Sequence, residues 1–283
     1  MPPCTYVHRH EVGSHYDVLK NVVYIQTIKL MQEAHPDGVV LIDTHSGPGV
    51  YDEVPEAYHK AANKVIERNL NAPPPVKKYV SILNKLKKEF GDGTLPGSPL
   101  FAREMMREND EHRLVDLFEE DVEGLFEDAV FQQADAYAPE TLDILLPNNE
   151  PLHPIVLIDP PYDDDQDWFK ARALFESILD RRPDATIVMW IPFIRDHGQR
   201  WSYAKSLKEL AKSKAKVGRY YCTIVVRKDQ LEGGAMMVAN ATKDLIDVVD
   251  EETLEWLAGV MNQGKGKNQR TCYDCVLCEY PSG

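Results

Sequence analysis

The sequence predicts an α/β fold with a mostly parallel sheet. Two short runs of β-branched residues and leucine, 39–42 and 155–158, show no alternation of apolar and polar residues, so both read as strands buried on both faces. Segments with helical spacing of apolar residues separate them. Each run ends in an acid, Asp43 or Asp159, followed by a segment rich in glycine or proline. Ligands bind at the carboxyl ends of the strands in open α/β sheets, so these two acids mark the expected site.

Length and composition describe an ordinary globular chain. Its 283 residues suffice for one large α/β domain, or for one domain with an insertion. No apolar run approaches the roughly 20 residues of a membrane helix, and the first residues do not form a signal peptide, so we expect a cytoplasmic protein. Five cysteines argue against a disulfide framework. A net charge of −14 counts against wholesale wrapping by nucleic acid, although a local basic face is compatible with it.

The first element is a helix that begins after a polar, histidine-rich segment. Ser14 is the expected N-cap, Asp17 is acidic in the first turn, and the helix should end near residues 35–36. The next element is the strand at 39–43, which runs into a turn with Gly47 and Gly49. Glycine allows positive φ and close backbone approach to a ligand. An acid followed by Gly-x-Gly indicates a nucleotide-cofactor loop, and the missing third glycine favours a mononucleoside-like cofactor over NAD.

Residues 52–95 interrupt the alternation of strands and helices. Two amphipathic helices are expected there, at 57–70 and 76–90, separated by three prolines. Between residues 60 and 88 there are eight lysines and arginines and one acid, a local charge of +7. We interpret this concentration as a surface for substrate phosphates, with a solvated helical face as the alternative.

The remaining chain predicts further strands and helices in turn. We expect a turn at 96–99, helices at 100–108, 122–128, 139–146, 168–179, 200–216 and within 245–261, and strands at 113–118, 130–134, 185–190, 219–226 and 235–241. Pro192 should break the strand before it, and Gly233-Gly234 should form the hairpin turn between the last two strands. The basic helix at 200–216 is either a second phosphate-contacting surface or a solvated face. Cys272, Cys275 and Cys278 either begin a metal site or belong to a strand.

The segment Asp159-Pro160-Pro161-Tyr162 is the expected catalytic corner. The prolines have no N–H to donate, so the strand ends in a stiff, extended bend. The Asp159 carboxylate and the Pro160 carbonyl could accept the two protons of a planar exocyclic amine, whose lone pair then faces an electrophile. Tyr162 could stack on the base, which is worth about 1–3 kcal/mol. The alternative is a strand end at which the acid merely caps the next helix.

Five segments of the chain resemble segments of a known protein family, and they follow one another in the same order as in that family. They are residues 13–20, 41–51, 96–100, 157–162 and 190–192. This is the family of bacterial large-subunit (23S) ribosomal RNA adenine-N6 methyltransferases, once described as DNA-uptake or external-DNA-catabolism proteins. The resemblance implies a Rossmann-like class I methyltransferase that uses S-adenosylmethionine, with a mostly parallel seven-stranded sheet. It also implies one domain over 1–283, a substrate-contacting segment at 1–16 and a helical insertion at 52–95.

The resemblance further assigns residues to the site. It implies that Asp159 is catalytic and that Tyr6 lies over the target base. Together with the roles inferred above for the corner, we expect Pro160 and Tyr162 to act with Asp159, and Tyr6, His8 and Tyr162 to contact the substrate base. Asp116 holds the cofactor ribose and Asp135 meets its adenine amine. The residues around the cofactor are Lys20, Asn21, Asp43, His45, Gly47, Gly49, Ser98, Asp116, Asp135, Ala136 and Asp159; no metal is expected at the site. Asn21, Asp116, Ala136 and Glu11 depart from the residues that are common in the family.

The expected activity is N6-methylation of an adenine in ribosomal RNA by a monomer. The base has to leave its stack, which is easiest in a single-stranded or unfolded site. One alternative is the same chemistry on DNA adenine, guanine or a glutamine amide. Another is a non-catalytic nucleic-acid-binding protein that retains the fold.

Overall fold

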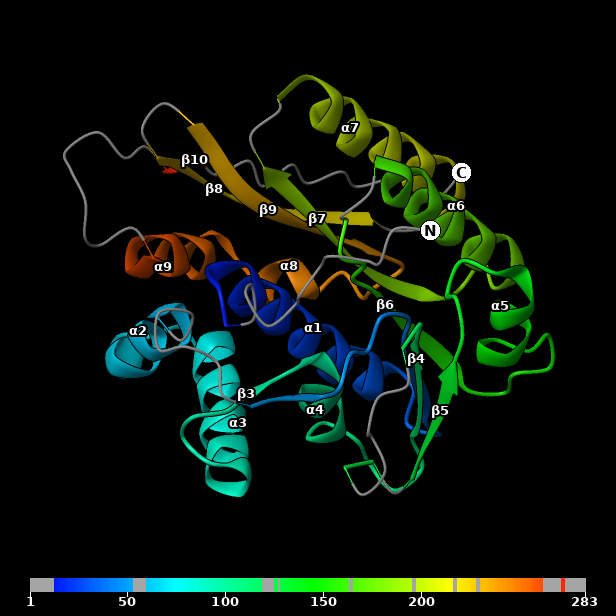
Figure 1. Cartoon of the computed structure of the whole chain (residues 1–283), viewed down its shortest axis with the longest axis horizontal. Coiled ribbons are helices and arrows are strands. Elements are labelled where there is room, and N and C mark those ends of the chain that lie inside the picture. Colours follow the sequence, from blue (N-terminus) through cyan, green and yellow to red (C-terminus); the bar gives the residue numbers. More distant parts are fainter. Residues whose placement is uncertain are drawn as a thin grey trace.

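A computed structural model describes residues 13–52, 60–118, 125–126, 128–162, 165–194, 197–215, 218–227, 230–261 and 271–272. Its centre is an eight-stranded sheet in the order β10-β8-β9-β7-β6-β1-β4-β5 (Figure 1). The strands are β1 (Val39–Asp43), β4 (Glu111–Asp116), β5 (Ala129–Gln133), β6 (His153–Ile158), β7 (Thr186–Ile194), β8 (Gly218–Arg227), β9 (Gln230–Ala239) and β10 (Thr271–Cys272). The five from β5 to β7 in this order are parallel, and β9, β8 and β10 continue the sheet in antiparallel pairs. The seven-stranded, mostly parallel prediction is confirmed apart from the two-residue edge strand β10.

Helices cover both faces of this sheet (Figure 1). They are α1 (His15–Ala34), α2 (Lys60–Arg68), α3 (Pro74–Phe90), α4 (Ser98–Arg103), α5 (Pro139–Leu145), α6 (Asp165–Arg181), α7 (His197–Lys214), α8 (Leu245–Val248) and α9 (Glu251–Met261). β1 shows why its sequence lacks alternation. Val39 and Leu41 pack into the core on the α1 side, and Val40 and Ile42 into the core on the α6 side. Both faces are therefore buried, as the apolar run predicts.

Helix α1 lies between the sheet and the helices that follow β1. The Oγ atom of Ser14 accepts the backbone N–H of Asp17 at 3.4 Å, which confirms the predicted cap. Helices α2 and α3 lie between two short strands, β2 (Val50–Tyr51) and β3 (Leu95–Pro96), that pair with each other. Because β2 and β3 are paired, the segment that contains α2 and α3 begins and ends at the same place beside the sheet. Helix α3 packs on α1 (Figure 1).

Several predicted boundaries are wrong for local physical reasons. Helix α4 begins at Ser98 instead of residue 100, because a proline at 99 is tolerated in the first helical turn, and it ends at Arg103 instead of residue 108. Strand β7 continues through Pro192 to Ile194. The pairing of β7 with β6 ends at Met189. At Pro192 the β6 side of β7 therefore has, among the described residues, no neighbouring strand that would need a backbone N–H donor, so a proline is tolerated there.

The predicted hairpin turn at Gly233-Gly234 is also wrong, since both glycines lie inside β9 and pair with β7 and β8. The segment 245–261, predicted to include an acidic helix, contains α9 and, before it, the short helix α8. The helix predicted at 122–128 falls largely outside the described residues, as do Cys275 and Cys278. Cys272 forms part of the edge strand β10. Within the described ranges there is no group of three or more metal-binding side chains, and no helix is long and apolar enough to cross a membrane.

Candidate active site

Three aspartates lie at the carboxyl edge of the parallel strands. Asp43 ends β1, Asp116 ends β4, and Asp159 follows β6 directly. β1 is hydrogen-bonded to β6 on one side and to β4 on the other, so the strand order reverses at β1. Such a reversal opens a crevice at the carboxyl ends, where α/β proteins bind ligands. The edge predicted from the sequence is the edge that brings these acids together.

The turn after β1 has the glycine geometry that the sequence predicts. Gly47 and Gly49 have φ values of 59° and 79°, in the left-handed region that favours glycine. A Cβ on Gly47 would stand 2.4 Å from the Tyr51 hydroxyl oxygen. The Gly47 N–H donates to Oδ2 of Asp116 at 2.8 Å. The turn is therefore bound to the end of β4 as well as to its own strand.

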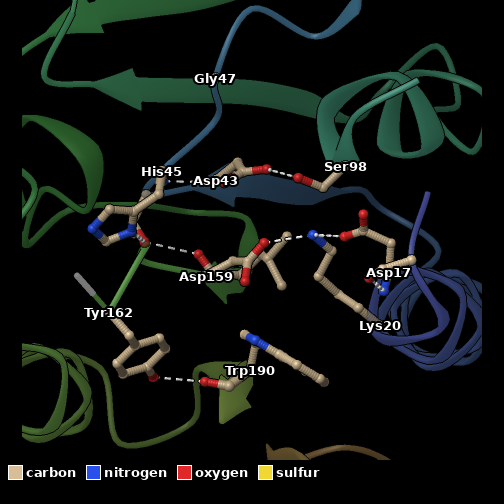
Figure 2. A network of polar contacts seen from close by, with 12 residues as sticks. Asp17, Lys20, Asp43, His45, Gly47, Ser98, Asp159, Tyr162 and Trp190 are labelled. Carbon is tan, nitrogen blue, oxygen red and sulfur yellow. Dashed lines mark hydrogen bonds and ion pairs between the residues drawn. The ribbon is translucent and has the colours of Figure 1, made fainter. Parts of the chain in front are cut away.

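Asp159 is held by a buried ion-pair network (Figure 2). The Nζ atom of Lys20 lies 2.5 Å from Oδ2 of Asp159 and 2.8 Å from Oδ1 of Asp17, and Lys20 is 4% exposed. Oδ2 of Asp17 accepts the Gly13 N–H at 2.7 Å. Burial lowers the pKa of the Lys20 ammonium, but the two carboxylates raise it by more, so the net pKa lies well above its usual value. Lys20 therefore stays protonated, and its ammonium group binds both the Asp17 carboxylate on helix α1 and the Asp159 carboxylate at the end of β6.

Asp43 is fully buried beside this network. Oδ2 accepts the Ser98 hydroxyl at 2.7 Å, and Oδ1 accepts the His45 N–H at 3.2 Å. Burial raises the pKa of Asp43 to about 7, even though these two hydrogen bonds favour the ionised form. Burial also lowers the pKa of His45 to about 3, so its imidazole is neutral, with Nδ1 2.8 Å from the Thr44 hydroxyl. Lys20, Asp43, His45 and Ser98, which are predicted to surround the cofactor, thus lie close to one another.

The edge next to β5 carries Asp135, predicted to meet the adenine amine of the cofactor, and Ala136, predicted to lie near the cofactor. The Asp135 carboxylate accepts the N–H of Tyr137 at 2.9 Å, and Ala136 is buried. The sequence reasoning missed Leu117 and Phe118, which follow Asp116 and expose 59% and 54% of their surface. In the sequence, two apolar residues directly after an acid at a strand end are the signal that could have indicated an apolar contact surface.

Tyr162 is anchored more firmly than a free stacking residue (Figure 2). Its hydroxyl donates to the carbonyl of Trp190 at 2.6 Å, and its ring centroid lies 4.5 Å from that of Trp168. Its φ of 55° is left-handed, which for a non-glycine residue costs about 1–3 kcal/mol and is typical of functional sites. Pro160, next to Asp159, is buried. The bend is therefore rigid, and its tyrosine is bonded to the neighbouring strand β7.

Other predicted residues are placed less completely. Asn21 is buried beside Lys20 on α1, and its Oδ1 atom has no hydrogen-bond partner in the described part of the chain. Tyr6 and His8, predicted to contact the substrate, lie outside the described residues. The role of Asp17 at Lys20 was not predicted, although an acid three residues before a lysine in a helix is a readable signal.

Comparison with known proteins finds relatives by sequence and by fold. The family model for ribosomal RNA large subunit methyltransferase D, RlmJ, matches residues 36–273. Ribosomal RNA large subunit methyltransferase J of Haemophilus influenzae is 28% identical over 214 residues, covering 67% of this chain and 70% of the relative. The protein of the same name from Escherichia coli K12 is 26% identical over 201 residues, with the same coverage.

A solved structure shares the fold over nearly the whole chain. Protein LPL1258 from Legionella pneumophila superposes with a TM-score of 0.76 at 18% identity, over 94% of this chain and 99% of that one. The strand order that reverses at β1, with helices on both faces, is Rossmann-like. With the family model matching most of its length, the chain belongs to the RlmJ family of ribosomal RNA large subunit methyltransferases.

Proposed function

We propose that the protein transfers a methyl group from S-adenosylmethionine to the N6 amine of an adenine in large-subunit ribosomal RNA. Membership of the family and the names of the two relatives support the reaction class and the RNA. The observation that carries the proposal is the position of Asp159. Its carboxylate follows a core strand and is fixed by a buried lysine beside the glycine turn of β1.

The residues at the sheet edge suit the methyl donor. Ser46 Oγ and Asn21 Oδ1 are buried polar atoms without partners in the described part of the chain, so a bound ligand can satisfy them. Leu117 and Phe118 present apolar surface beside Asp116, whose carboxylate retains lone pairs for ribose hydroxyls. When bound, S-adenosylmethionine supplies an electrophilic methyl group on a sulfonium.

Asp159 and Pro160 orient the attacking nitrogen. Lys20 binds Oδ2 of Asp159, and Oδ1 makes no hydrogen bond within the described residues, so it can accept one N–H of the amine. The Pro160 carbonyl accepts the other. The lone pair then faces the methyl group, and the N–C bond forms as the S–C bond breaks. The nitrogen becomes acidic only after transfer, when Asp159 or solvent takes its proton, so alignment supplies most of the acceleration.

The RNA has to approach an acidic protein, and α3 offers the place. Lys77, Lys78 and Lys88 are exposed on this helix, and none forms an ion pair with another described residue. On α7, by contrast, Lys214 pairs with Glu176 and Asp180 of α6, which favours a solvated face there. In this proposal the protein acts as a monomer of one domain, with residues 52–95 contacting phosphates and residues 1–16 contacting the base.

Substitution of Asp159 tests the proposal. Asp159→Ala should abolish N6-methyladenine formation in transcribed 23S ribosomal RNA, detected by mass spectrometry, with cofactor affinity by calorimetry within about threefold of wild type. Asp143→Asn is a control, since Asp143 is 65% exposed at its side chain. Methyl transfer retained by Asp159→Ala would refute the role. Faster transfer to DNA of the same sequence would favour the DNA alternative, and a wild type that does not bind the cofactor would favour a non-catalytic protein.

A further inference from the structure

Gly234 occupies a position where no side chain fits. It lies inside β9, opposite Pro192 of β7, and its φ is not left-handed, so no turn requires glycine here. A Cβ at this position would lie 1.7 Å from Cη2 of Trp190, 2.5 Å from Cζ3 and 2.6 Å from Cζ2. All three atoms belong to the six-membered ring of the indole. The glycine is therefore required by the indole that lies over it.

The indole has little freedom to move aside. Trp190 is 8% exposed and belongs to the core on the α1 side of the sheet, together with Met236 and Val238 of β9. On α1, the Tyr16 ring lies 5.5 Å from the Trp190 ring, centroid to centroid. Cores are packed at near-crystalline density, so a methyl group at residue 234 has to displace the ring or separate β7 from β9.

Trp190 is joined to the proposed site on two sides. Its carbonyl accepts the Tyr162 hydroxyl at 2.6 Å, one residue beyond the last β6–β7 pair, so Tyr162 binds a strand end that β6 no longer covers. Its ring touches Tyr16, the residue before Asp17, which binds Lys20. Figure 2 shows the indole and the Tyr162 ring on the same side of Asp159. A displacement of Trp190 would therefore disturb Tyr162 directly, and Lys20 through Tyr16 and Asp17; both residues lie beside Asp159.

We propose that Gly234 is a positioning residue for methyl transfer: it admits the Trp190 indole against β9, and the placed tryptophan fixes Tyr162 and the start of α1 around Asp159. This inference rests on the proposed function. It gives the Gly-Gly pair in β9 a role in the reaction rather than in a turn.

A set of four variants of the full chain tests the inference. Gly234→Ala introduces the clash, Trp190→Leu removes the ring that it meets, and the third variant combines the two. Gly259→Ala is the matched control, because Gly259 lies in α9 with nothing within 4 Å of an added Cβ. Methylation of 23S ribosomal RNA transcript is measured as kcat and KM. Rates are expressed per cofactor-binding site from calorimetric stoichiometry, so that unfolded protein does not count.

We expect Gly234→Ala to lower kcat at least tenfold, with the S-adenosylmethionine Kd within threefold of wild type. Gly259→Ala should match wild type. On the Trp190→Leu background, Gly234→Ala should change kcat less than twofold, a comparison that holds even where the single variant does not fold. Wild-type kcat per site in Gly234→Ala, or equal losses on both backgrounds, would overturn the inference alone. A wild type without methyl transfer would overturn the proposed function and this inference with it.

Discussion

Replacement of Lys20 by methionine tests whether the buried ion pair organises the site. The variant keeps the length of the side chain but leaves the Asp17 and Asp159 carboxylates, 2.8 and 2.5 Å from the lost ammonium, without their shared cation. Their side chains are only 14% and 9% exposed, so water compensates little. Removal of one partner from a buried ion pair typically costs about 3–5 kcal/mol, and we expect a loss in this range at pH 8.

The pH dependence supplies the sharper test. In the Lys20 variant, the buried carboxyl pair binds a proton more tightly than the same groups do in the unfolded chain. The folded state then holds more protons than the unfolded state above about pH 4, so stability falls as pH rises. The deficit should therefore shrink by about 1 kcal/mol or more between pH 8 and pH 5. In the wild type, the raised pKa of Lys20 keeps the ammonium charged over this range, and its contribution stays constant.

Urea unfolding at both pH values measures the two effects. Lys29→Met is the matched control on the same helix, because Lys29 is 53% exposed and lies 3.9 Å from Glu33 in a surface pair. Such pairs contribute about 0–1 kcal/mol. Combination of Lys20→Met with Asp159→Asn should recover part of the loss. A deficit below about 1 kcal/mol that does not vary with pH would show that the carboxylates do not depend on Lys20.

Two further predictions concern the residues around this pair. Tyr162→Phe removes the hydroxyl that donates to the Trp190 carbonyl, so we expect the free energy of unfolding, measured with urea, to fall by about 1–2 kcal/mol. Methyl transfer should be slower, with an unchanged cofactor Kd. An unchanged kcat would show that the anchored hydroxyl is not needed. Burial raises the pKa of Asp43 to about 7, so this carboxyl group binds its proton more tightly in the folded state than in the unfolded chain. As the pH rises from about 5 to about 7, wild-type stability should therefore fall by roughly 2 kcal/mol more than the stability of Asp43→Asn. Parallel curves of stability against pH would contradict that pKa.

The strands could be predicted from the sequence because their signal is local. β1 coincides with the predicted 39–43, since burial on both faces selects an uninterrupted apolar run. The glycine turn could also be predicted, because Gly47 and Gly49 need positive φ whatever surrounds them. Gly234 could not. Its pattern is that of a turn, and only the ring of Trp190, packed from another strand, shows that space rather than conformation selects glycine there.

The pairing of Lys20 with Asp159 lies beyond local patterns for a related reason. The two residues are 139 positions apart, and no spacing rule connects a helix before β1 to the end of β6. The resemblance to a family placed both near the cofactor but did not indicate their contact. The contact arises because α1, although first in the chain, packs on β6, β7 and β9 and is buried on nearly every side. Tertiary packing thus brings the Lys20 ammonium to the Asp159 carboxylate. The site therefore forms only when α1 packs on strands that lie more than a hundred residues later in the chain.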